Sequence, residues 1–174
     1  MIVGIVKHHP SANTHFFQVV PPYTVRMDET RKRLVLVRLL YVSRAVGPQT
    51  TAVTDSILSV ALGANRQRGI TGVLCQGQGL YLQVLEGERG VINPLYNRIA
   101  QDRRHQDVQL LLLEEITQRR YADWAMAHVK LSEDDAMIRL NHPEFDPYSA
   151  PGASMLQMVE DLFAAGHRIR KTSV

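Results

Sequence analysis

The sequence predicts an α+β fold of the ferredoxin-like type, a five-stranded sheet built as βαββαββ with both helices on one face and further helices at the C-terminus. The first observation is the alternation of short apolar runs with amphipathic stretches between residues 34 and 131. The second is a glycine-containing turn between two adjacent apolar runs, which indicates a hairpin. The third is one helical stretch on either side of that hairpin. Right-handed crossovers then place the two helices together, with a groove between them.

The composition is that of a folded domain with appendages. The chain has 174 residues, and 45% of them are hydrophobic, which is enough to bury a core. The formal net charge of +3 comes from arginines spread along the chain, so no direct nucleic-acid binding is expected. A single cysteine, Cys75, excludes an internal disulfide and a cysteine-rich zinc site. No run has the length of a membrane span, and we expect a cytoplasmic protein.

The predicted domain begins at the first strand. Residues 1–33 carry scattered apolar residues and a Pro21-Pro22 pair without a sustained period, so we expect an N-terminal extension there that lacks regular order. From Leu34 to Val42 the chain is nearly all Leu and Val, which is typical of a central strand buried on both faces. We place the domain at residues 34–131.

A helix and a hairpin follow the first strand. Thr50 or Thr51 can cap the helix, Gly69 ends it, and its apolar residues recur at helical spacing: Val53, Ile57, Ala61 and Ala64. The next two apolar runs are joined through glycines that tolerate positive φ. They are therefore predicted to be the two strands of the hairpin, Ile70–Cys75 and Leu80–Leu85.

The second half of the domain repeats the helix and adds two strands. The helix begins near Gly87–Gly90, and its apolar residues share one face: Val91, Leu95 and Ile99. Residues Val108–Leu113 are predicted to form the fourth strand. A short fifth strand is expected over Trp124–Lys130.

Residues 132–174 are predicted to be a C-terminal helical extension. Ser132 starts a short helix to about Leu140, and a last helix spans about Gly152–Gly166. One side of the last helix is apolar: Met155, Met158, Val159 and Leu162. This side needs a surface to cover, which is either the exposed face of the sheet or a partner chain.

A glutamine interrupts the third strand. Gln83 stands within Leu80–Gly87, among residues that otherwise suit a buried strand. An unpaired amide in an apolar interior costs about 2–7 kcal/mol. Gln83 therefore meets either another polar side chain or a ligand with matching donors and acceptors.

Several motifs occur in a fixed order around this glutamine. They are Leu-Leu-Tyr-Val-Ser-Arg-Ala with Tyr41, Arg-Gly-Ile-Thr-Gly-Val-Leu after Asn65, Leu-Gln-Val-Leu-Glu-Gly with Gln83, Arg-Ile-Ala-Gln-Asp-Arg-Arg-His, and Arg-Arg-Tyr-Ala-Asp-Trp-Ala-Met with Trp124 and Met126. In this order they resemble the BLUF family of blue-light receptors, which bind FAD. The resemblance covers about residues 34–130. Any one motif alone would be a weak signal.

The resemblance implies a flavin ring between the two helices. Asn65 is the position whose amide would pair with the polar edge of the ring, although an asparagine here also suits a plain helix cap. By resemblance Ile57 and Ile99 would sandwich the ring. Arg98, Asp102 and His105 match positions along the ring edge and the ribityl-phosphate side, while a surface ion pair is the alternative for Arg98 and Asp102. Ala64 replaces a residue that is often Asn or His in the family.

The resemblance also implies a mechanism. Gln83 would lie between Tyr41 and the flavin, and light would drive electron and proton transfer from Tyr41 through Gln83. The amide would then end rotated or tautomerised, with a slight red shift of the absorption. Trp124 and Met126 are candidate levers beside Gln83, and Met126 is the better candidate to touch it. Two residues apart in a regular strand they would share a face, so an exchange between them needs a bulge or a register change.

The output expected from the resemblance is a protein contact rather than a reaction. We expect a non-enzymatic photoreceptor that forms a dimer or larger homo-oligomer and signals through its C-terminal helices to an effector protein acting in trans. Basic residues around the second helix favour FAD over FMN. The alternative is a small acylphosphatase-like or nucleotide-binding protein of the same fold. The segment Gly87–Gly90 with Arg89 could hold an anion, but no catalytic group is apparent.

Overall fold

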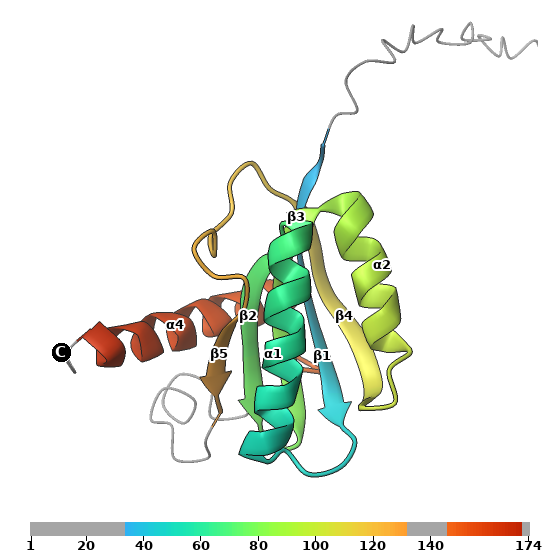
Figure 1. Ribbon diagram of the computed structural model, residues 1–174, viewed down its shortest axis with the longest axis vertical. Helices are drawn as coiled ribbons and strands as arrows, with labels where there is room; N and C mark the ends of the chain where they lie inside the picture. The colour runs from blue at the N-terminus through green and yellow to red at the C-terminus, as the bar shows by residue number, and fades with distance from the viewer. Residues whose placement is uncertain (1–33, 132–145, 172–174) are drawn as a thin grey trace, which may run out of the picture. The chain divides into compact units, whose positions relative to one another are not determined.

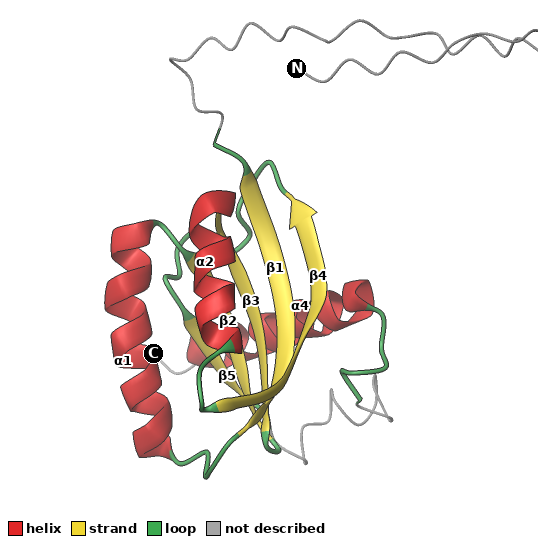
Figure 2. Ribbon diagram, turned by 90° about the vertical axis from the view of Figure 1, so that its right-hand side faces the viewer, coloured by secondary structure: helices red, strands yellow, loops and turns green. Residues whose placement is uncertain are grey.

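The computed structural model describes residues 34–131 and 146–171, and it confirms the predicted ferredoxin-like sheet. The five strands lie in the order β4-β1-β3-β2-β5. Helices α1 and α2 cover one face, and α4 crosses the other face (Figures 1 and 2). In chain order the elements are β1 (Leu36–Ala45), α1 (Thr51–Arg68), β2 (Thr71–Gly77), β3 (Leu80–Glu88), α2 (Arg89–Ala100), β4 (His105–Glu115), β5 (Ala127–Lys130) and α4 (Gly152–Lys171).

The sheet is built around β1, which pairs antiparallel with both β3 and β4. The hairpin β2–β3 turns through Gln78 and Gly79, whose φ angles are +53° and +73°. Two consecutive residues of positive φ define the type I′ turn, whose twist matches the twist of the flanking strands. The predicted hairpin is therefore confirmed. Strand β5 adds to the far edge of the sheet, parallel to β2.

Helix α1 has the predicted caps. Thr50 is the N-cap and accepts a hydrogen bond from the Val53 amide at 3.3 Å. Gly69 ends the helix in the left-handed region at φ +62°. The fully buried residues of the helix are polar, Thr54 and Asn65, while the apolar ones are at most half-buried. This is the pattern of a helix that borders a cavity rather than a solid core.

Two cores lie on opposite faces of the sheet. One packs α1 and α2 against alternate residues of β1 and β3, such as Leu39 and Leu85. The other packs α4 against the intervening residues, such as Leu40 and Val84. The apolar side of α4 faces this second core and is at most 3% exposed: Met155, Met158, Val159 and Leu162. The sequence left two surfaces open for the apolar side of the last helix, the exposed face of the sheet or a partner chain. In the structure this side covers the face of the sheet that α1 and α2 leave exposed.

The fifth strand is shorter than predicted, and this corrects the placement of two site residues. β5 begins at Ala127, so Trp124 and Met126 precede the strand. The Trp124 amide donates to the Tyr121 carbonyl at 3.0 Å, and the Trp124 carbonyl accepts from the Gly72 amide at 3.2 Å. This turn takes the place of the first residues of the predicted fifth strand. The predicted extension over residues 1–33 and the predicted helix over residues 132–140 lie outside the described residues.

Candidate functional site

A cavity of about 360 Å³ lies between α1 and α2, where the sequence predicted a groove. The walls come from the two helices, and the floor comes from β1, β2 and β3. Its size falls within the range of about 300–1,000 Å³ that small-molecule sites occupy. The lining contains eight of the ten predicted site residues: Tyr41, Ile57, Asn65, Gln83, Arg98, Ile99, Asp102 and His105.

A chain of three side chains crosses the floor of this cavity. Tyr41 lies opposite Gln83 in the β1–β3 register. The Tyr41 hydroxyl donates to Gln83 Oε1 at 2.6 Å, and Gln83 Nε2 donates to Met126 Sδ at 3.3 Å. In this arrangement the amide oxygen faces Tyr41 and the amide nitrogen faces Met126. A thioether is a weak acceptor, so the amide nitrogen keeps donor capacity for a ligand.

Tyr41 is a buried, neutral phenol. Its side chain is 1% exposed. Desolvation raises the pKa of the hydroxyl far above its usual range, and the nearby Tyr81, Tyr96 and Asp102 act in the same direction. Burial disfavours the phenolate because the charge would lose its hydration. Tyr41 therefore keeps its proton at neutral pH and is available as a hydrogen-bond donor.

Asn65 ties α1 to the segment before β5. It is 5% exposed, and its Nδ2 donates to the Ala125 carbonyl at 3.1 Å. The helix ends at Gly69, so the Asn65 side chain does not cap it. One N–H of the amide is used, which leaves the carbonyl oxygen and a second N–H for a ligand.

The α2 side of the cavity is apolar inside and charged at its mouth. Ile57 and Ile99 are half-buried lining residues from opposite helices, and Arg98 is exposed. The suggested pair of Arg98 with Asp102 is wrong, because α2 ends at Ala100 and Asp102 instead pairs with Arg104 at 2.6 Å. That hydrogen bond lowers the pKa of the Asp102 carboxyl to about 2.

His105 closes the cavity at the start of β4. Its Nδ1 lies 2.7 Å from Ser43 Oγ, and its ring centroid lies 4.9 Å from that of Tyr81. Burial lowers its pKa below the usual 6.5; Asp102 opposes this effect and Arg104 adds to it. The imidazole is therefore mainly neutral at pH 7, and it can donate one hydrogen bond and accept another.

Trp124 lies on the other face of the sheet from Met126. Met126 belongs to the core beneath α1 and α2, whereas Trp124 packs against the core beneath α4. Its ring meets Phe163 edge to face, with centroids 5.9 Å apart. Because both residues precede β5, they reach opposite faces without the bulge that a regular strand would need. The predicted Met126 contact with Gln83 is present, while Trp124 does not line the cavity.

Several residues that line the cavity or contact its lining were not predicted. The ring of Tyr96 in α2 lies 5.8 Å from that of Tyr41, and the Ser43 hydroxyl forms a hydrogen bond with His105. Arg68 and Arg104 add positive charge at the mouth. A pattern of polar residues on the inner face of α1 could have revealed Arg68, since it lies three residues after Asn65. Nothing in the local sequence distinguishes Tyr96 from an ordinary core residue.

The lining suits a flat heteroaromatic ligand. Half-buried isoleucines on facing helices offer the two faces of a ring apolar contact, while the Asn65 and Gln83 amides offer donors and acceptors at its edge. Arginines at the mouth suit an anionic tail. Over residues 34–131 and 146–171, no group of His, Cys, Asp and Glu residues is arranged to hold a metal ion. Within those same ranges, no helix is long and apolar enough to cross a membrane.

Fold and cavity together define a class of protein, the ferredoxin-like domains that hold a planar ligand between two helices. The profile of one family, described as BLUF, sensors of blue light using FAD, matches residues 36–127. The match spans more than half of the chain, and the chain therefore belongs to the BLUF family. FAD is the cofactor by which this family is defined.

Known proteins of this family resemble the chain in sequence and structure. BlrB, a BLUF protein solved in its dark state, is 30% identical with a TM-score of 0.64 over 76% of this chain and 98% of that one. BlsA in its photo-activated state is 28% identical with a TM-score of 0.65, over 73% and 94%. The photoactivated adenylate cyclase subunit alpha of Euglena gracilis is 38% identical over 86 residues, which are 49% of this chain but 8% of that protein. The chain thus matches only a small part of this curated relative.

Proposed function

We propose that the protein is a blue-light receptor that binds FAD in the cavity and converts absorption into a rearrangement of the Gln83 amide. The observation that carries this proposal is the hydrogen-bonded chain from Tyr41 through Gln83 to Met126 on the cavity floor. Its two ends differ in kind, because one is a phenol that can donate an electron and a proton, and the other is an adaptable thioether.

The proposed binding roles follow from the lining. Ile57 and Ile99 hold the faces of the ring, and Asn65 pairs with its polar edge. A second hollow of about 580 Å³ shares Arg68 and Arg98 with the cavity. Guanidinium groups suit phosphate oxygens, so this opening supports a diphosphate and FAD rather than FMN. Asp102 and His105 shape the remaining rim.

The proposed switch uses the asymmetry of the Gln83 amide. A bound flavin excited by blue light supplies a strong one-electron oxidant. Tyr41 is the donor closest to Gln83, and its hydroxyl proton already points at Oε1. Rotation of the amide would turn its nitrogen to Tyr41 and its oxygen to Met126. Oxygen and sulfur are both acceptors, so the Met126 contact would weaken.

The proposed output is carried by protein contacts. We assign residues 34–131 to sensing and residues 132–174 to output, with a separate effector protein as the recipient of the signal. We expect the chain itself to be non-enzymatic, cytoplasmic and assembled as a dimer or larger homo-oligomer. The similarity to a bacterial light-regulated adenylyl cyclase and to the photoactivated adenylate cyclase subunits of Euglena gracilis supports a downstream effector.

The acylphosphatase-like alternative is not favoured. Its anion site needed a free Arg89 beside Gly87–Gly90, but Arg89 pairs with Glu115. The Glu88 carboxylate also accepts from the Gly90 amide at 3.2 Å, so it occupies the start of α2 with negative charge. A phosphate group would be repelled there.

The test is the absorption spectrum of the purified protein in darkness and after blue light. We expect a flavin spectrum that shifts slightly to the red and recovers in darkness. Tyr41→Phe should bind flavin and lose the shift, because the phenol proton is absent. Tyr148→Phe is the matched control, since its hydroxyl bonds the Asp107 carbonyl away from the cavity. A colourless protein that FAD does not reconstitute would contradict the proposal.

A further inference from the structure

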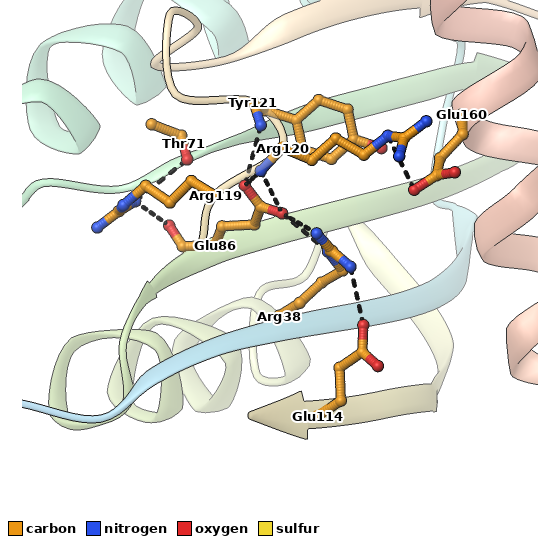
Figure 3. Close-up of polar contacts among 8 residues, drawn as sticks. All are labelled: Arg38, Thr71, Glu86, Glu114, Arg119, Arg120, Tyr121 and Glu160. Carbon is orange, nitrogen blue, oxygen red and sulfur yellow. Dashed lines mark hydrogen bonds and ion pairs between the residues drawn. The ribbon is translucent and has the colours of Figure 1, made fainter. Parts of the chain in front are cut away.

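A buried carboxylate on the face opposite the cavity organises the segment that carries Met126. Glu86 of β3 is fully buried. Its oxygens accept from the Arg120 amide at 2.9 Å and the Tyr121 amide at 3.1 Å, and they pair with the Arg38 guanidinium at 2.7 Å (Figure 3). One side chain thus fixes the backbone of two consecutive residues outside any regular element. We call residues 119–121 the corner.

The charge of Glu86 is balanced within the sheet. Arg38 of β1 bridges it to Glu114 of β4, at 2.9 Å from the second carboxylate. Burial acts to lower the pKa of Arg38, but hydrogen bonds and charges from Glu86 and Glu114 outweigh it, and the net shift is upward. The guanidinium therefore stays charged, and the corner is anchored to three strands.

Arg119 fixes the corner from the other side. Its guanidinium donates to Thr71 Oγ1 at 3.1 Å and to the Glu86 carbonyl at 2.7 Å (Figure 3). It also donates to the Gly69 carbonyl at 2.6 Å. These partners are the C-cap of α1, the first residue of β2 and the end region of β3. The corner is therefore held at the ends of three regular elements of the domain.

The corner and the residues that follow it contact helix α4. Arg120 pairs with Glu160 at 3.0 Å. The Tyr121 and Trp124 rings both meet Phe163 edge to face, with centroids at 5.3 and 5.9 Å. Two residues further on, Met126 accepts the Gln83 bond on the opposite face of the sheet. Residues 121–126 therefore join the Gln83 amide to α4.

We propose that Glu86 and Arg119 are positioning residues that together fix the corner, so that displacement of Met126 is delivered through Trp124 to Phe163 of α4. If the corner is fixed and Met126 moves, the residues between them, including Trp124, must move as well. If the corner were loose, it would shift instead and Trp124 would stay in place. The trigger for this movement rests on the proposed function. The coupling itself is a property of the chain that exists without light.

The first experiment needs no light and measures amide hydrogen exchange of the full-length protein in darkness. Arg119→Gln and Glu86→Gln should speed exchange at residues 121–127 and in α4 over residues 155–163. Arg89→Gln, which breaks an exposed ion pair with Glu115, should change neither. Arg119→Gln leaves no buried charge unpaired, so it remains informative if Glu86→Gln does not fold. Faster exchange confined to residues 119–121 would overturn the coupling.

The second experiment compares exchange in darkness and under blue light. In the wild type, light should speed exchange in α4. In Arg119→Gln the red shift should persist, while the light-induced change in α4 should fall by a factor of about 2 or more, the lower end of the coupling that such networks carry. An unchanged light effect on α4 would overturn the proposal. A wild type without a red shift would refute the proposed function, and the dark experiment would then decide the coupling alone.

Discussion

At the scale of the residue, the cavity floor depends on how Gln83 is oriented. An amide placed in a strand has to bond with its surroundings, and here it bonds to a phenol on one side and a thioether on the other. These partners are unequal, because the phenol is a strong donor and the sulfur a weak acceptor. The phenol can also accept from an amide nitrogen, whereas the sulfur can only accept, so Met126 is the partner that favours this orientation over the rotated one.

Met126→Leu tests this inequality. The two side chains have similar volumes, so we expect the free energy of unfolding to fall by less than about 1.5 kcal/mol. The substitution removes the acceptor that favours the dark orientation. Dark recovery should slow by about 2- to 5-fold, equivalent to about 0.5–1 kcal/mol for one weak hydrogen bond. Flash spectroscopy of the flavin-loaded protein measures the rate, and unchanged or faster recovery would contradict the assignment.

His105 should make stability depend on pH in a defined direction. Its pKa is lowered in the folded protein, so the unfolded chain binds more protons between the folded pKa and 6.5. The contribution of His105 is therefore fully present above pH 6.5 and is lost as the pH falls toward the folded value. Ser43, Tyr81, Asp102 and Arg104 surround the ring.

The check is urea unfolding of the wild type and His105→Gln between about pH 8 and about pH 5. The wild type should lose stability relative to the variant as the pH falls, because glutamine does not titrate. Other titrating groups act on both proteins and cancel in the difference. A difference that stays constant, or that grows in favour of the wild type at low pH, would rule out a lowered His105 pKa.

At the scale of the element, close approach of strands limits what the sheet tolerates. A Cβ built on Gly72 of β2 would lie 2.0 Å from the Val84 carbonyl of β3. Backbone atoms cannot yield as a flexible side chain can. Gly63 in α1 is the contrasting case, because nothing lies within 4 Å of a Cβ placed there.

Gly72→Ala and Gly63→Ala should therefore differ in sign. The first should lower the free energy of unfolding by about 1–3 kcal/mol or more, because the hairpin must open to admit the methyl group. The second should raise it by up to about 1 kcal/mol through helix propensity. Chemical denaturation at one pH measures both. Equal effects would mean that the strands move apart at little cost.

At the scale of the whole molecule, α4 completes the second core. The sheet has apolar side chains on both faces, and only one face is covered by α1 and α2. Met158 of α4 is 1% exposed on the other face. Helix α4 thus contributes to stability as well as to the proposed output.

Met158→Ala should lower the free energy of unfolding by about 2–5 kcal/mol, the usual cost of truncating a buried methionine. The control is Gln157→Ala, which changes an exposed neighbour on the same helix. Denaturation curves of both variants against the wild type give the comparison. A Met158→Ala protein as stable as the control would indicate that α4 does not pack on the sheet in solution.

Much of the fold and of the cavity could be predicted from the sequence because the signals are local. Apolar runs, the Thr50 and Gly69 caps and the hairpin glycines each act within a few residues. Eight of the ten predicted site residues line one cavity. The errors lie where non-local bonds decide the structure, as in the segment before β5, where the strand expected from Trp124 begins only at Ala127 because the bonds of Trp124 form a turn.

The sequence by itself determined the order of the elements, the family and the types of side chain that line the cavity, because periodicity and motif order are properties of the chain. Only the tertiary structure decided that Trp124 and Met126 lie on opposite faces, that α4 covers the sheet, and that Glu86 anchors the corner. These features join residues far apart in the chain. Burial, and the requirement that a buried carboxylate be paired, determine which residues come into contact. No local sequence pattern indicates these contacts.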